Sequence, residues 1–152
     1  AVGQAYVVAG VKNELAVIGG EGSGSMVLPS FTKAFDGFLM MALVLEAMAK
    51  SAVSLGELLR RLPRFHIVKR RIPCEARRAY PVLDQLTRES DEWREGGEVS
   101  TLDGIRVDWG TGWLHVRASH TEQVIRVISE DQEKEKAQQR AEQTVRRITE
   151  LL

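Results

Sequence analysis

The sequence of 152 residues lacks two features that would place it in an oxidising compartment or on a polyanion. It contains a single cysteine, Cys74, so no disulfide can form within the chain, as is usual in a reducing cytoplasm. Its 21 basic and 21 acidic side chains leave no net charge to attract nucleic acid or an anionic membrane over long range. We therefore expect a cytoplasmic protein with no nucleic-acid partner, in which any anion is bound locally.

Long hydrophobic runs are also missing. The longest, at 38–45, is much shorter than a membrane span and is followed by Glu46, so no membrane partner is expected. The first residues lack the basic region and cleavage signature of a signal peptide. They also lack an initiator methionine and lead directly into apolar sequence, which we interpret as a cut end.

The sequence contains no recognisable catalytic or metal-binding arrangement. His66, His115 and His120 do not form metal-ligand spacing with Cys74 or with a carboxylate pair. No Ser/His/Asp or Cys/His arrangement is present, and no nucleophile stands out. We therefore predict no catalytic residue and no metal ligand in this chain.

Residues 1–63 have an α/β pattern. The apolar run 15–18 ends at a glycine-rich loop and predicts a short buried strand. Asp36 precedes the long apolar segment 38–49, which predicts a capped helix buried against a sheet. Ser54 and Glu57 form a capping-box pattern for a second helix, kept short by Pro63.

Residues 64–152 have an α+β pattern. Strands are expected at 66–72, 105–109, 113–117 and 123–128, the last three forming an antiparallel meander with a three-residue hairpin turn. Apolar residues at helical spacing predict helices at 75–89 and 131–152, and the polar segment 90–100 predicts a loop.

The first loop that could carry chemistry is 19–25, which combines glycines with Glu21, Ser23 and Ser25. The glycines let the backbone lie close to a ligand. A carboxylate with hydroxyls suits sugar hydroxyl groups, whereas Glu21 would repel a phosphate. The alternative is a tight turn with incidental polar residues, and the residue types alone favour that alternative.

The second loop, 117–122, lies between two predicted strands and contains Arg117, Ser119 and Thr121. A guanidinium matches two phosphate oxygens, and the hydroxyls and backbone amides can donate to the same group. A serine/threonine turn beside an exposed arginine explains the residues equally well. The residue types alone leave the two interpretations about even.

Both segments together resemble the α-D-phosphohexomutases, which include phosphoglucomutase, phosphomannomutase and phosphoglucosamine mutase. Segment 20–25, GEGSGS, is similar to the family's sugar-recognition loop, usually Gly-Glu-x-Ser-Gly-His. Segment 117–123, RASHTEQ, is similar to its phosphate loop, usually Arg-Pro/Ala-Ser-Gly/Asn-Thr-Glu-Pro. Asp36 and Gly37 before the long helix, and DGIRV at 103–107, support the resemblance, which covers nearly the whole chain.

The resemblance implies that only the C-terminal part of such a protein is present. Residues 1–63 would be the later part of the third, α/β domain. Residues 64–152 would be the fourth domain, an antiparallel sheet covered by helices (TBP-like). Intact members are isomerases that move phosphate between C1 and C6 of a hexose. By resemblance, Glu21, Ser23 and Ser25 would hold the sugar of a hexose phosphate.

The resemblance also assigns Arg117, Ser119, His120 and Thr121 to the phosphate that is not transferred. Ser25, His120 and Gln123 depart from the usual family residues at their positions. His120 adds a group that titrates near pH 6.5, so phosphate affinity is expected to strengthen below that pH.

The family's phosphoserine loop and its Asp-x-Asp-x-Asp-Arg magnesium loop are absent from the sequence. The chain alone is therefore not expected to catalyse, and magnesium and the missing N-terminal mutase domains are expected upstream. The alternatives are a non-catalytic sugar-phosphate-binding or regulatory module and a remnant with a structural role.

Overall fold

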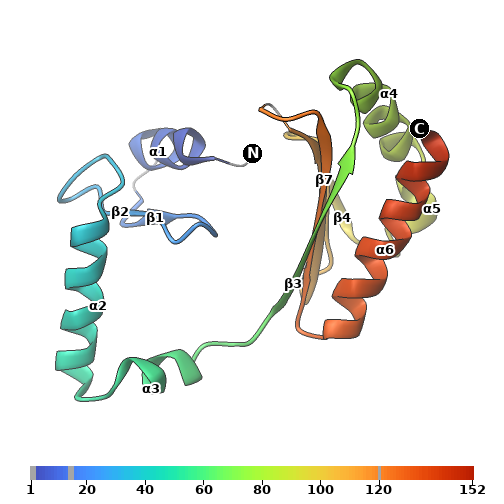
Figure 1. Cartoon of the computed structure of the whole chain (residues 1–152). Coiled ribbons are helices and arrows are strands. Elements are labelled where there is room, and N and C mark those ends of the chain that lie inside the picture. The colour runs from blue at the N-terminus through green and yellow to red at the C-terminus, as the bar shows by residue number, and fades with distance from the viewer. Residues whose placement is uncertain (1–2, 14–15, 120) are drawn as a thin grey trace. The chain divides into compact units, whose positions relative to one another are not determined.

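A computed structural model describes residues 3–13, 16–119 and 121–152 of the chain (Figure 1). The chain forms two compact units, Ala1–Pro63 and Arg64–Leu152, which are described separately below. The fold class is the predicted one: a mixed α/β unit is followed by an antiparallel sheet covered by helices. Among the residues described, no helix has the length and apolar character needed to cross a bilayer.

The first unit consists of three helices and one small hairpin. Its elements are α1 (Gln4–Asn13), β1 (Gly19–Gly20), β2 (Met26–Val27), α2 (Gly37–Ser51) and α3 (Leu55–Arg60). The two strands pair antiparallel, with Gly19 opposite Val27. Helix α1 packs on β1 at Gly19, where an added Cβ would lie 2.5 Å from Cγ1 of Val11. Glycine is required there because the helix leaves no space for a side chain.

The strand predicted at 15–18 is not present in the described part of this segment. Leu15 lies outside the described residues, and 16–18 form no strand, since β1 begins at Gly19. Val17 and Ile18 are exposed. A strand requires a hydrogen-bonded neighbour, and β1 and β2 pair only with each other within the described residues.

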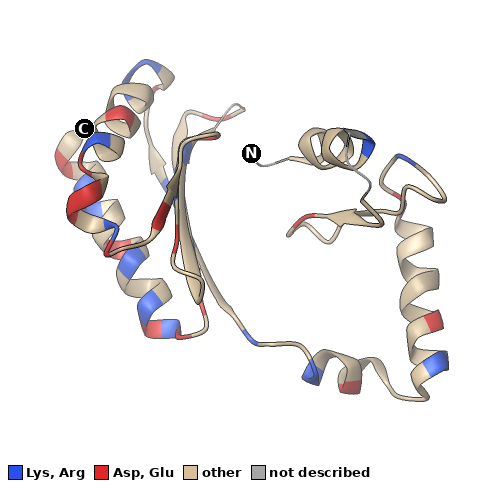
Figure 2. Ribbon diagram, turned by 180° about the vertical axis from the view of Figure 1, so that it is seen from behind, with Lys and Arg blue, Asp and Glu red and all other residues tan. Residues whose placement is uncertain are grey.

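Helix α2 begins as predicted but is not buried as predicted. Asp36 caps it, because its Oδ1 accepts a hydrogen bond of 2.9 Å from the Leu39 amide. No residue of the helix is buried, and Phe38 and Leu45 are 83% and 63% exposed. Figure 2 shows the helix uncharged over most of its length. The prediction was wrong because the described residues of the first unit form only a two-stranded sheet, which is too small to cover an apolar helix.

The capping box of helix α3 is confirmed. The Ser54 side chain accepts from the Glu57 amide, and the Glu57 carboxylate accepts from the Ser54 amide. The hydrogen bonds that the Glu57 carboxylate accepts from the Ser54 amide and the Ser54 hydroxyl lower the pKa of Glu57. The helix ends at Arg60, before Pro63, as predicted.

The second unit is a five-stranded antiparallel sheet with helices on one face (Figure 1). Its strands are β3 (His66–Pro73), β4 (Glu98–Ser100), β5 (Ile105–Asp108), β6 (Gly112–Ala118) and β7 (Val124–Asp131). Their order across the sheet is β3-β7-β6-β5-β4. The helices are α4 (Ala76–Arg88), α5 (Ser90–Trp93) and α6 (Lys134–Leu151).

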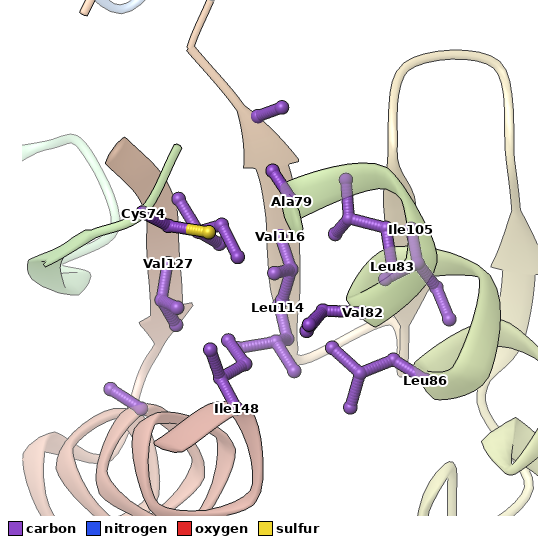
Figure 3. Packing of buried hydrophobic residues seen from close by; sticks show 13 residues of the cluster. Cys74, Ala79, Val82, Leu83, Leu86, Ile105, Leu114, Val116, Val127 and Ile148 are labelled. Atoms are coloured by element: carbon purple, nitrogen blue, oxygen red, sulfur yellow. The ribbon is translucent and has the colours of Figure 1, made fainter. Parts of the chain in front are cut away.

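The core of the second unit lies between the sheet and its helices (Figure 3). Helix α6 packs on β3 and β7, while α4 packs on β5, β6 and β7. The buried residues of α4 are those that its helical spacing predicted: Ala79, Val82, Leu83 and Leu86. The helix-facing strand positions are mostly apolar, as the predicted alternation requires, and include Ile105, Val107, Leu114, Val116, Ile125 and Val127.

Two predicted boundaries in this unit were wrong. The expected loop at 90–100 contains the short helix α5 and the edge strand β4. Strand β4 adds to the sheet by pairing with the next strand, β5, and its three residues are too few for an alternating pattern to predict it. Residue Asp131, expected to open the last helix, is instead the last residue of β7, and α6 begins at Lys134.

The hairpin between β5 and β6 is confirmed. The Trp109 amide donates to the Gly112 carbonyl across the turn, and Asp108 faces Trp113 on the neighbouring strand. Gly110 has φ +78°, which favours glycine, and its amide donates to Oδ1 of Asp108. This hairpin determines which residues of β6 lie on each face of the sheet.

Candidate functional site

The glycine-rich loop between β1 and β2 is held by backbone hydrogen bonds at its base. The Glu21 amide donates to the Ser25 carbonyl at 3.2 Å, and the Gly24 amide donates to the Glu21 carbonyl at 3.0 Å. Gly24 has φ +86°, so glycine is favoured at that turn position. The tight turn brings the Glu21, Ser23 and Ser25 side chains together.

These three predicted sugar-binding side chains form one hydrogen-bonded group. The Ser23 hydroxyl lies 2.8 Å from Oε1 of Glu21 and 3.2 Å from the Ser25 hydroxyl. Gln4 of α1 donates to the Ser25 hydroxyl at 3.1 Å. The group is accessible to solvent. A carboxylate with adjacent hydroxyls can accept and donate hydrogen bonds in the pattern that sugar hydroxyls require.

The loop leaves open space beside this group. A Cβ added at Gly22 or Gly24 would meet no atom within 4 Å. Gly19, Gly20, Glu21, Gly24 and Ser25 line a shallow hollow with Ile18 and Met26. A ligand in that hollow could contact backbone and the acidic group together, since the glycines present no side chains.

In the second unit, Arg117 lies near the end of β6 and belongs to the face of the sheet opposite the helices. Its Nε donates to Oδ1 of Asp103 at 3.2 Å, and the two side chains are only 12% and 15% exposed. Asp103 lies in the turn between β4 and β5. The contact explains how a guanidinium can be largely buried, because a buried charge requires a partner.

Two further arginines lie at the level of Arg117 on the next two strands of the sheet, β7 and β3. Arg117 of β6 faces Arg126 of β7, and Arg126 in turn faces Arg71 of β3. We call Arg71, Arg126 and Arg117 the arginine row. Directly opposite residues on antiparallel strands lie about 5 Å apart at their Cβ atoms, so three positive charges are brought close together.

Glu122, in the loop between β6 and β7, partly neutralises the arginine row. Its carboxylate contacts Arg126 at 2.6 Å and Arg71 at 2.5 Å. The hydrogen bond from Arg126 is the largest influence that lowers the pKa of Glu122. With Asp103, the row has two carboxylates for three guanidinium groups. The local excess of positive charge favours an anion.

One donor of the arginine row also has no partner in the part of the chain that the structure describes. The Nε of Arg126 is buried and makes no hydrogen bond within the described residues. An unpaired buried donor costs about 1–3 kcal/mol, so an acceptor supplied by a ligand would be stabilised there. Neither Arg71 nor Arg126 was predicted as a site residue. Strand register could have revealed them, because Arg126 lies opposite Arg117 on the next strand, and Arg71 lies opposite Arg126.

The remaining predicted phosphate residues lie in the loop after Arg117. The Ser119 amide donates to the Val124 carbonyl at 2.9 Å and closes the loop, and Thr121 is exposed. His120 lies outside the described residues, so its predicted role stays a prediction. The structure thus brings Arg117 and Ser119 to the end of the sheet that bears the arginine row.

Sequence reasoning also missed His115, which is two residues before Arg117 on the same face. It is only 4% exposed, and its Nε2 lies 2.6 Å from the carbonyl oxygen of Asp103. Burial lowers the pKa of His115, against the raising effect of Asp103. Arg106 lies opposite it on β5. The predicted alternation placed His115 on the Arg117 face, but local sequence did not indicate its burial.

Other parts of the second unit offer less to a sugar phosphate. Among the described residues, no group of three or more His, Cys, Asp or Glu side chains is placed to hold a metal ion. A cavity of about 350 Å³ lies on the helix face, between α4, α5 and α6, and includes Trp93, Trp109 and the Glu89–Arg147 ion pair. It contains none of the arginine row, so this cavity is not the candidate anion site.

The chain is similar to known proteins over its whole length. Residues 1–65 match the family description "Phosphoglucomutase/phosphomannomutase, alpha/beta/alpha domain III", and residues 71–147 match "Phosphoglucomutase/phosphomannomutase, C-terminal domain". A "Phosphoglucomutase/phosphomannomutase" of Thermococcus kodakarensis is 30% identical over 99% of this chain and 32% of its own length. A "Probable phosphoglucosamine mutase" of Methanothermobacter thermautotrophicus is 32% identical over 94% of this chain and 32% of its own length.

A solved structure shares the fold. A phosphoglucomutase/phosphomannomutase family protein from Burkholderia thailandensis superposes with a TM-score of 0.80 at 24% identity, covering 99% of this chain and 31% of that chain. The chain therefore spans about a third of the length of the relatives that it matches. The domain matches and the conserved fold agree that this chain belongs to the phosphoglucomutase/phosphomannomutase family and corresponds to its domain III and C-terminal domain.

Proposed function

We propose that this chain is the C-terminal portion of a phosphohexomutase, of the phosphomannomutase or phosphoglucomutase type. In this proposal it binds a hexose phosphate while a phosphoryl group moves between C1 and C6 of the sugar. The arginine row carries the proposal. It provides more positive than negative charge at one end of an antiparallel sheet, beside the loop that contains Ser119.

In the proposed site, the arginine row binds the phosphate that is not being transferred. Arg117 offers a planar pair of donors, Arg126 offers its unpaired Nε, and Ser119 and Thr121 offer hydroxyls. His120 would add a donor in the same loop. Charge-assisted hydrogen bonds contribute about 1.5–3 kcal/mol each, so a few of them suffice to hold a phosphomonoester.

The sugar is assigned to the loop between β1 and β2. Glu21 accepts hydrogen bonds there, while Ser23 and Ser25 both donate and accept. A carboxylate beside the phosphate itself would oppose binding, so the acidic group serves the sugar and the arginine row serves the phosphate. Separate binding groups for the sugar and for the phosphate suit a ligand that must bind with either of its two phosphates in the reacting position.

The chemical step is assigned to the missing upstream mutase domains. The sequence has no phosphoserine loop, and the part of the chain that the structure describes contains no cluster of three or more His, Cys, Asp or Glu side chains placed to hold a metal ion. In the proposed enzyme, an isomerase, magnesium held upstream would neutralise charge on the phosphoryl group. The cytoplasm is the proposed location, which the lone Cys74 supports.

Titration of the chain with glucose 1-phosphate, mannose 1-phosphate and inorganic phosphate, followed by amide chemical shifts, tests this proposal. Arg117→Ala should weaken all three ligands about tenfold or more, because it removes the charge-assisted donors. Glu21→Ala should weaken only the two sugar phosphates. Arg88→Ala is the matched control, because Arg88 pairs with Asp84 on the helix face and should leave every affinity unchanged.

The proposal is contradicted if Arg117→Ala binds phosphate as tightly as the native chain. If the sugar phosphates bind no more tightly than inorganic phosphate, the proposed contact of Glu21 with the sugar is contradicted. The alternative of a non-catalytic binding module predicts the same affinities, so the upstream coding sequence must separate the two. An in-frame phosphoserine loop and an Asp-x-Asp-x-Asp-Arg loop favour the enzyme.

A further inference from the structure

The turn that contains Asp103 and Gly104 is fastened to strand β6 beside Arg117. The His115 Nε2 contacts the Asp103 carbonyl oxygen at 2.6 Å, and since a carbonyl only accepts, this nitrogen carries the proton and donates. Gly104 has φ +74°, and a Cβ there would lie 2.2 Å from the Val116 carbonyl oxygen. The turn therefore lies directly on the β6 backbone, where only glycine fits.

This turn aims one carboxylate at one nitrogen of Arg117. Oδ1 of Asp103 accepts from Nε of Arg117 at 3.2 Å, in a setting where both side chains are nearly covered. In an end-on contact, the two terminal nitrogens of the guanidinium donate to two phosphate oxygens, and Nε takes no part. Holding Nε restricts the rotation of a long side chain, whose immobilisation would otherwise oppose ligand binding.

A carboxylate beside a phosphate site has two opposite effects. Asp103 repels the phosphate through its negative charge, which weakens binding. It also restrains the guanidinium, which strengthens binding. The surrounding charges include Arg106 on β5 and Arg126 on β7, so the repulsion is partly compensated. Removing the carboxylate therefore separates the two effects: phosphate affinity falls if the restraint of Arg117 dominates and rises if charge repulsion dominates.

We propose that Asp103 and His115 are positioning residues for the phosphate site: His115 holds the Asp103 main chain in place, and Asp103 orients Arg117 for end-on contact with phosphate. This inference rests on the proposed function, because it assumes that Arg117 binds phosphate. Neither residue touches the ligand. His115 acts through Asp103, and Asp103 acts through Arg117.

Affinity of the whole chain for inorganic phosphate and glucose 1-phosphate tests the inference, with thermal unfolding measured on each variant. Asp103→Ala should lower the affinity for phosphate about tenfold, although it removes a negative charge, because the Arg117 guanidinium loses its restraint. Asp103→Asn should bind at least as tightly as the native chain, since its amide oxygen still accepts from Nε while the repulsion is gone.

His115 is tested in the same way. His115→Leu should lower the affinity for phosphate several-fold, while His115→Gln, which keeps an N–H donor, should retain most of that affinity. The matched controls are Asp108→Asn, which alters another ion pair on the same face, and His66→Leu at an exposed position. Both should leave the phosphate affinity unchanged.

A measurement on the native chain keeps the test independent of whether each variant folds. The Nε–H proton of Arg117 should exchange with solvent markedly more slowly than that of the exposed Arg88. Rapid exchange, or an Asp103→Ala variant that folds and binds phosphate more tightly, overturns the inference. If Arg117→Ala weakens phosphate and Asp103→Ala does not, only the inference fails. If Arg117→Ala has no effect, the proposed function fails as well.

Discussion

The two units of this chain differ in how they use similar apolar residues. The second unit covers its sheet with α4 and α6, and residues such as Leu86, Leu114 and Ile148 are buried. In the first unit, α2 is richer in apolar residues, yet none is buried. Burial contributes about 25 cal/mol per Å² of apolar surface removed from water. The comparison shows that apolar composition stabilises a unit only when another surface is present to cover it.

The two candidate loops differ in the same way. Glu21, Ser23 and Ser25 contact one another and Gln4 on an exposed turn. Arg117 is instead held within a sheet by strand register and by its largely buried contact with Asp103. Side chains on rigid elements are positioned more accurately than those on loops. The candidate residue Arg117 is therefore positioned more rigidly than the side chains of the loop between β1 and β2.

The largest contrast is expected for core truncations. Ile148→Ala should lower the free energy of unfolding by about 2–5 kcal/mol, because it removes a fully buried side chain and leaves a cavity. Leu45→Ala should change it by less than about 0.5 kcal/mol, because Leu45 is exposed. Urea unfolding followed by circular dichroism measures both. An equal decrease in unfolding free energy for both variants would contradict this contrast and mean that α2 is covered in solution.

A smaller contrast is expected between two glycines. Gly104→Ala should cost about 2–4 kcal/mol, since it forces a positive φ and places Cβ against the Val116 carbonyl. Gly22→Ala should be nearly neutral, because nothing lies within 4 Å of the added atom. The midpoint of thermal unfolding reports both changes. A tolerated Gly104→Ala would show that the turn does not lie on β6 as described.

The smallest contrast is expected between a covered and an exposed ion pair. Asp131 is buried and contacts Arg140, while Glu46 and Lys50 pair on the exposed surface of α2. Asp131→Asn should cost about 1–2 kcal/mol at neutral pH, and Glu46→Gln less than about 0.5. Unfolding free energies from urea titrations at pH 7 measure both changes.

The Asp131 contribution should also depend on pH. Burial tends to raise the pKa of Asp131, but the Glu133 amide and Arg140 outweigh it, so the pKa is lowered. The contribution is therefore complete above the unfolded-state pKa of about 3.9 and is lost as the pH falls through the lower folded value. The difference in unfolding free energy between the native chain and Asp131→Asn should disappear in that acid range. A gap that persists at the lowest pH would assign the effect to packing rather than to charge.

Local patterns predicted the elements whose determinants are short in sequence. The Asp36 cap, the Ser54–Glu57 capping box and the hairpin at Gly110 were correct, because each depends on side chains within a few residues. Strand β4 was missed because it has only three residues, and the arginine row was missed because it depends on the register between paired strands, of which β3 and β7 lie far apart in the chain. Both candidate loops were located by their residues, but the partners of Arg117 were not.

By itself, the sequence determined the caps, the alternating strands, the apolar stripes of α4 and α6 and the position of both loops. These follow from the periodicity of helices and strands and from hydrogen bonds between near neighbours. Only the tertiary structure decided that α2 remains uncovered in this chain, that three arginines share one level of a sheet, and that His115 is buried beside Asp103. Burial and register are properties of surfaces that meet in three dimensions, and a local pattern cannot specify what lies opposite it.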